Sequence, residues 1–121
     1  MSYDYHIFMV VAMFILLDMI SGLMQAIKNK RVSSSIMRDG IIHKFSFVLA
    51  IALAYACEYG MIYLDLGFTL PIMTTTCVVI CLTELVSILE NLGKLNPELQ
   101  NKKFMHIFDS VKTGDDDVER Y

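Results

Sequence analysis

The sequence has few charged residues and no broad basic region. Of its 121 residues, 19% are Asp, Glu, Lys or Arg, whereas 55% are hydrophobic and the mean hydropathy is +0.53. A soluble domain contains roughly 45–50% apolar residues. The basic residues form no patch with interleaved aromatic residues, so we expect no nucleic-acid partner. A chain of this length has no room for a soluble catalytic domain beside a membrane anchor, and we expect one small unit surrounded by lipid.

The sequence also lacks the usual patterns of enzymes and metal sites. The three cysteines, Cys57, Cys77 and Cys81, lie in apolar segments without CxxC spacing, which argues against a disulfide framework and a zinc site. No pair of carboxylates and no Ser, His and Asp set has catalytic spacing. We therefore expect no enzyme, no catalytic residue, no metal and no cofactor. The first apolar run lacks a basic n-region and a small-residue cleavage site, so we expect no cleavable signal peptide.

Three apolar runs, at about 6–27, 45–64 and 69–91, meet the length of roughly 17–25 residues required of a spanning helix. Pro71 falls in the first turn of the third, and Gly93 is expected to cap its end. Basic residues and serines interrupt the pattern at 28–44, which predicts a loop or short helix at the interface. We predict an all-α integral membrane protein with a transmembrane domain at 1–93 and a cytoplasmic charged tail at 94–121. A short amphipathic helix is expected at Lys102–Val111.

The placement of basic residues predicts the orientation. All ten Lys and Arg residues lie in 28–44 or after the third run, and the other two non-membrane segments have none. By the positive-inside rule, the N-terminus is outside and the C-terminus inside a bacterial cytoplasmic membrane. The basic residues of 28–44 either anchor the chain to anionic lipid or serve only to set the topology. These residues are Lys28, Lys30, Arg31, Arg38 and Lys44.

Each apolar run carries one central acid: Asp18, Glu58 and Glu84. An ionised carboxylate at the bilayer centre costs about 2.5–3.5 kcal/mol on insertion scales, so each acid needs a partner or water. Three interpretations stay open at this point: pairing with Lys28, Lys44 or Lys94, a water-lined face in an oligomer, and an ion or proton relay. Helical spacing places further polar or small residues on the faces of the first and third acids. The candidate pore and packing residues are Asp18, Ser21, Gly22, Gln25, Glu58, Glu84, Ser87 and Asn91.

The second run also carries a stripe of small residues. Ala52, Ala56 and Gly60 follow one another at steps of four, a spacing that lets another helix approach closely. Three short helices make a bundle too thin to hide three acids. We therefore expect these residues to serve helix packing and the chain to form a homo-oligomer.

Three stretches together resemble one known family. They are Asp18-x-x-Ser21-Gly22 followed by Ala26 and Lys28-Asn29-Lys30; Ser33-Ser34-Ser35 with Arg38-x-Gly40-x-x-x-Lys44; and Glu84-x-x-Ser87-Ile88-x-Glu90-Asn91 with Gly93 and Pro97. In order, spacing and placement around three apolar runs, the chain resembles the holins of Gram-positive phages, a family that includes clostridial toxin-secretion holins. The resemblance covers about residues 18–97.

The resemblance implies a small membrane protein that accumulates, oligomerises and opens holes through which an endolysin or a toxin leaves the cytoplasm. It implies lipid and further copies of the chain as partners, an antiholin as a further candidate partner, and the endolysin or toxin as cargo rather than a bound partner. Two other functions fit the residues alone. A small ion or proton channel or transporter subunit would use the same acids, and an antiholin or membrane scaffold would act through the tail.

Overall fold

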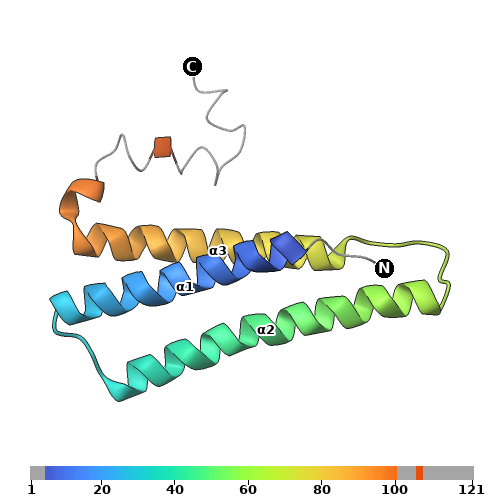
Figure 1. The fold of residues 1–121 in the computed structure, drawn as a ribbon, viewed down its shortest axis with the longest axis horizontal. Helices are drawn as coiled ribbons and strands as arrows, with labels where there is room; N and C mark the ends of the chain where they lie inside the picture. The colour runs from blue at the N-terminus through green and yellow to red at the C-terminus, as the bar shows by residue number, and fades with distance from the viewer. Residues whose placement is uncertain (1–4, 101–105, 108–121) are drawn as a thin grey trace.

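The computed structural model describes residues 5–100 and 106–107, and this part of the chain is helical without strands (Figure 1). Helix α1 spans Tyr5–Lys28, α2 spans Ser34–Tyr63, and α3 spans Ile72–Leu95, followed by the 3-10 turn η1 at Pro97–Gln100. All three α-helices are long and apolar enough to cross a membrane. The prediction of an all-α fold with three transmembrane helices is confirmed.

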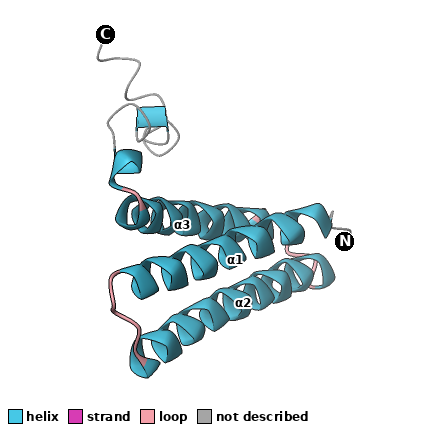
Figure 2. Ribbon diagram, turned by 60° about the vertical axis from the view of Figure 1, so that its left-hand side comes forward, coloured by secondary structure: helices cyan, strands magenta, loops and turns pink. Residues whose placement is uncertain are grey.

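Helix α3 is the central element of the bundle. It runs parallel to α1 and antiparallel to α2, and it packs against both of them, whereas α1 and α2 share little direct contact (Figures 1 and 2). Seven residues of α3 are buried, against three of α1 and one of α2. The outer faces of α1 and α2 therefore remain open to the surroundings of the chain.

A small apolar core lies where the three helices meet. It consists of Val11, Ala54, Met73, Cys77 and Ile80, with half-buried Ile, Phe and Cys side chains around it. Many large apolar side chains point outward instead, on all three helices. Such an outward apolar surface is the expected one for a helical bundle solvated by lipid.

Helix α2 begins eleven residues earlier than the predicted start at residue 45, and this prediction was wrong. Ser33 has an extended backbone, and its hydroxyl accepts a hydrogen bond from the Ile36 N–H at 3.2 Å. The serine therefore starts the helix as an N-cap. With 30 residues, α2 is about 45 Å long, which exceeds the ~30 Å hydrocarbon thickness.

The connection between α1 and α2 is a tight turn of residues 29–33. Lys30 has a positive φ of 56°, the Arg31 N–H donates to the Ala26 carbonyl at 2.8 Å, and the Lys30 N–H donates to the Ile27 carbonyl at 3.2 Å. These two bonds form a Schellman motif, in which a left-handed residue closes the helix end. The predicted interfacial segment at 28–44 is thus mostly the first three turns of α2.

Helix α3 also differs from its predicted bounds. It starts at Ile72, directly after Pro71, and continues to Leu95, where the Asn96 N–H donates to the Leu92 carbonyl at 2.9 Å. The expected cap at Gly93 was wrong, because this glycine is buried inside the helix. A Cβ there would lie 2.9 Å from the Gln100 side chain, so the absence of a side chain lets η1 fold back onto α3.

The predicted amphipathic helix at Lys102–Val111 lies outside the described residues except for His106 and Ile107, which are helical.

Candidate functional site: a polar cluster joining three helices

One lysine joins all three helices. The Lys44 amine, on α2, donates to Asp18 Oδ2 on α1 and to Glu84 Oε2 on α3, the latter at 2.5 Å. The side chains are 14%, 9% and 1% exposed in that order. Glu84 is thus fully enclosed by the bundle, and the Lys44 side chain reaches it from α2.

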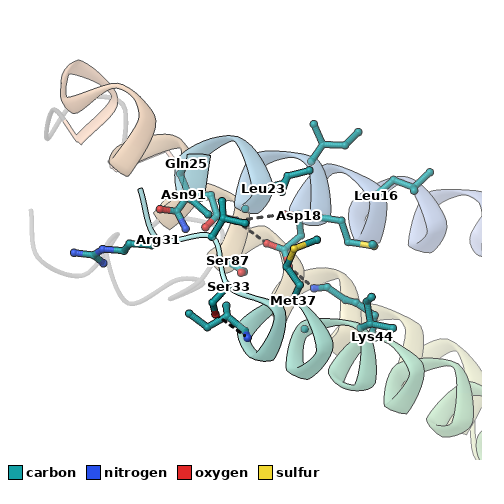
Figure 3. A pocket seen from close by; sticks show the side chains of 18 residues that line it. Leu16, Asp18, Leu23, Gln25, Arg31, Ser33, Met37, Lys44, Ser87 and Asn91 are labelled. Carbon is teal, nitrogen blue, oxygen red and sulfur yellow. Dashed lines mark hydrogen bonds and ion pairs between the residues drawn. The ribbon is translucent and has the colours of Figure 1, made fainter. Parts of the chain in front are cut away.

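Asn91 completes the cluster from α3, two turns after Glu84. Its amide Nδ2 donates to Asp18 Oδ1 at 2.9 Å and to Ser21 Oγ at 3.1 Å. The Ser21 hydroxyl in turn donates to the Asp18 carbonyl at 3.2 Å. Figure 3 shows Asp18 between Asn91 and Lys44, so both carboxylate oxygens of Asp18 have a donor.

The polar cluster, defined as Asp18, Ser21, Lys44, Glu84 and Asn91, lies near the middle of α1. Asp18 precedes the last residue of α1 by ten positions, about 15 Å at 1.5 Å per residue. Within the described residues, every buried side-chain nitrogen and oxygen has a hydrogen-bond partner. Such satisfaction is required because an unpaired polar group in hydrocarbon costs several kcal/mol.

The cluster answers one question that the residues alone left open. Among the three interpretations of the intramembrane acids, local pairing with a lysine is the arrangement within a single chain, and Lys44 is that lysine. Removing one partner of a buried ion pair costs roughly 3–5 kcal/mol, whereas replacing the whole set by apolar residues is often neutral. We therefore expect loss of Lys44 to weaken the packing of the three helices.

The other candidates on the first and third helices lie beside the cluster. Gln25 and Ser87 are half-buried. Gly22 faces Asn91, whose Nδ2 would lie 3.4 Å from a Cβ at that position, so glycine leaves room for the amide. The predicted polar face of α1 is thus directed at α3.

A groove opens between α1 and α2 on one side of the cluster, with a volume of about 480 Å³. It is lined by residues 16–26 of α1, the turn at 31–33, the first turns of α2, and two residues of α3 (Figure 3). Asp18, Lys44 and Asn91 form its polar side, and most of the other lining residues are aliphatic. The groove exists because α1 and α2 scarcely touch each other.

Glu58 lies apart from the cluster, at the other end of α2. Its Oε1 accepts a hydrogen bond from the Met73 N–H at 2.9 Å, in the first turn of α3. The N-cap residue Pro71 offers no side-chain acceptor, so the carboxylate satisfies one of the free N–H groups of that helix end. A negative charge there also interacts favourably with the helix dipole.

Within the described residues, the predicted small-residue stripe takes no part in the packing of the three helices. Ala52 and Ala56 are exposed, and no atom lies within 4 Å of the Cβ position at Gly60. Ala54, on another face of α2, is the buried alanine. The stripe stays a prediction about contacts between copies.

The predicted basic anchor is divided between two surroundings. Lys44 belongs to the polar cluster, and the Lys28 amine donates to the Leu95 carbonyl at the end of α3. Lys30, Arg31 and Arg38 are exposed around the turn that joins α1 to α2. Within the described part of the chain, no group of three or more His, Cys, Asp or Glu residues is arranged to hold a metal ion.

Comparison with known proteins shows the family to which the chain belongs. The model of the bacteriophage holin family matches residues 3–112. No curated protein and no solved structure matches. The match covers most of the chain, and the family consists of non-enzymatic, pore-forming membrane proteins. With its three membrane-length helices, this chain is a multi-pass protein of the cytoplasmic membrane and belongs to the bacteriophage holin family.

Proposed function

We propose that copies of this holin assemble in the cytoplasmic membrane and open holes that release an endolysin or a toxin. The polar cluster holds the single chain in a closed arrangement, with its charges paired inside the bundle. On opening, the faces that carry Asp18 and Glu84 turn toward water in the hole. The proposed orientation has the N-terminus outside and the turn at 29–33 in the cytoplasm, as the distribution of basic residues indicates.

The observation that supports this proposal is the contrast between the cluster and the rest of the bundle. Polar groups from all three helices are paired at its centre, yet only a few apolar residues hold α1 and α2 in place. Water can solvate the same charged groups if the helices separate. The closed and the open arrangement therefore differ by an exchange of ion pairs for hydration, without loss of a large apolar core.

The test is inducible expression in a bacterium, with membrane potential and release of a large cytosolic reporter enzyme recorded together. Abrupt depolarisation with reporter release supports a large hole. Depolarisation without release indicates an ion channel, and the absence of any effect indicates an antiholin or scaffold. Either of these two results contradicts the proposal.

A triple variant tests the part played by the cluster. Asp18→Leu, Lys44→Leu and Glu84→Leu together replace the paired charges by apolar side chains, which keeps the closed packing and removes the groups that water solvates in the hole. We expect this variant to accumulate in the membrane and to release little or no reporter. The matched control is Glu90→Leu with Lys94→Leu, which removes exposed charges near the end of α3 and keeps wild-type release. Release by the triple variant at wild-type timing would contradict a water-lined face.

A further inference from the structure

The groove between α1 and α2 has the length of one membrane leaflet. On α1 it extends from Leu16 to Ala26, a rise of ten helical steps or about 15 Å. The hydrocarbon core of a bilayer is ~30 Å thick, so one leaflet contributes about 15 Å. Because Ala26 lies next to the end of α1 and Asp18 near its middle, the groove runs from the membrane surface to mid-bilayer.

Most of the groove wall is aliphatic, and the charged groups on its polar side are paired with each other. Asp18, Lys44 and Asn91 bond to partners within the cluster. The groove therefore offers an apolar chain two hydrocarbon walls and a polar side without free charges. The wall residues are Leu16, Ile20 and Leu23 from α1 and Ile36, Met37 and Ile41 from α2.

A positive charge lies at the surface end of the groove. Arg31 lines this end and is exposed, and its side chain extends away from Lys44 in Figure 3. Within residues 5–100, no carboxylate forms an ion pair with its guanidinium. Lys30 is exposed beside it in the turn. An arginine at this depth matches the phosphate of a lipid headgroup, which a guanidinium binds through two parallel hydrogen bonds.

The size and lining of the groove favour a lipid chain. Its volume of about 480 Å³ lies within the roughly 300–1,000 Å³ of small-molecule sites. Its length of about one leaflet, its aliphatic walls and the arginine at its surface end match an acyl chain attached to a phosphate.

We infer that the groove binds one anionic phospholipid, with the phosphate at Arg31 and an acyl chain between α1 and α2. The lipid fills the space that these two helices leave between them, beside the polar cluster. Lipid composition would then influence how firmly the closed arrangement is held.

The test is native mass spectrometry of the detergent-solubilised protein with phosphatidylglycerol or phosphatidylcholine. The wild-type chain should retain the anionic lipid several-fold better than the zwitterionic one. Arg31→Gln should abolish that preference. Gly40→Leu should reduce retention of both lipids at least several-fold, because Gly40 lines the groove and nothing lies within 4 Å of its Cβ position, so that a leucine fills the groove without a clash.

Two matched controls make the test specific. Arg38→Gln removes the same charge from an exposed position that does not line the groove, and Cys57→Leu places a leucine at an exposed position of α2 outside the groove. Both should retain lipid as the wild-type chain does. Equal losses in Arg38→Gln would show general attraction of charge, and unchanged retention in Gly40→Leu would show that lipid binds elsewhere. A lipid-free dimer as the main species would show that a second copy covers this face. Each of these results overturns the inference.

Discussion

Replacing Lys44 by methionine is the most direct perturbation of the polar cluster. Methionine keeps most of the length of the side chain and removes its charge and its donors. Asp18 and Glu84 then face each other across the bundle without a cation between them. We expect Lys44→Met to weaken the closed arrangement and to make hole formation earlier.

The expected size of the effect follows from burial. Both carboxylates are more than nine-tenths buried, and loss of one partner from a buried ion pair costs roughly 3–5 kcal/mol. Because about 1.4 kcal/mol changes an equilibrium constant tenfold, this corresponds to a shift of roughly a hundredfold or more away from the closed arrangement. The hydrogen bonds from Asn91 to Asp18 remain and place the effect near the lower end of that range.

The assay is the time from induction to loss of membrane potential, compared at equal amounts of protein in the membrane. Lys94→Met is the matched control, since it removes one positive charge from an exposed position near the end of α3. Lys44→Arg retains the cation and should stay close to wild-type timing. Lys44→Met combined with Glu84→Gln removes one of the two opposed carboxylates and should restore part of the delay.

Three results would refute this reasoning. Equal timing of Lys44→Met and Lys94→Met would show that the ion pairs do not hold the closed arrangement. A Lys44→Met chain that reaches the membrane and opens later than wild type would reverse the predicted direction. If Lys44→Met fails to accumulate, the double variant with Glu84→Gln decides. If this double variant restores none of the delay while Lys44→Arg inserts stably and keeps wild-type timing, that result would also contradict the argument.

Three further predictions concern individual contacts, each measured on the purified protein in detergent. Asn91→Ala leaves Asp18 Oδ1 without its donor and should lower stability by about 1–3 kcal/mol, seen as a lower thermal midpoint; an unchanged midpoint would contradict this. Glu58→Ala removes the acceptor of the Met73 N–H and should lower stability by about 0.5–2 kcal/mol. Amide exchange should become faster only in the first turn of α3, and equally faster exchange along the whole of α3 would argue against a capping role. Lys30→Gly should raise the midpoint, because a left-handed conformation costs a non-glycine residue roughly 1–2 kcal/mol; a lower midpoint would show that the lysine side chain itself stabilises the turn.

The number and approximate place of the helices could be predicted because each run of apolar residues has the length of a bilayer crossing. The start of α2 could not, because a serine after basic residues looks the same whether it interrupts a helix or caps one. The structure shows that Ser33 caps a helix, with its hydroxyl bonded to the Ile36 N–H. Nothing in hydropathy marks that difference, since the first turns of α2 lie outside the most apolar part of the helix.

The position of Lys44 depends on that same start. With a helix beginning at residue 45, Lys44 belongs to an interfacial loop and reads as one of several basic anchors. With a helix beginning at Ser34, it lies on the same face as Phe47, Ile51 and Ala54, which pack toward the core. From the sequence, pairing of Lys44 with Asp18 and Glu84 was therefore only one of several alternatives. The helix bounds were needed to identify Lys44 as the partner of these acids.

The rotation of α2 about its own axis explains why the small-residue stripe faces outward. Two alanine patterns compete on this helix, one through Ala54 and one through Ala52 and Ala56, and spacing alone favours neither. Lys44 and Glu58, however, are fourteen residues apart, close to four helical turns, and thus lie near one face. Lys44 meets the acids of α1 and α3, while Glu58 meets the first turn of α3. These polar contacts, one in the first half of α2 and one near its end, hold Ala54 inward and leave the other stripe available to a second copy.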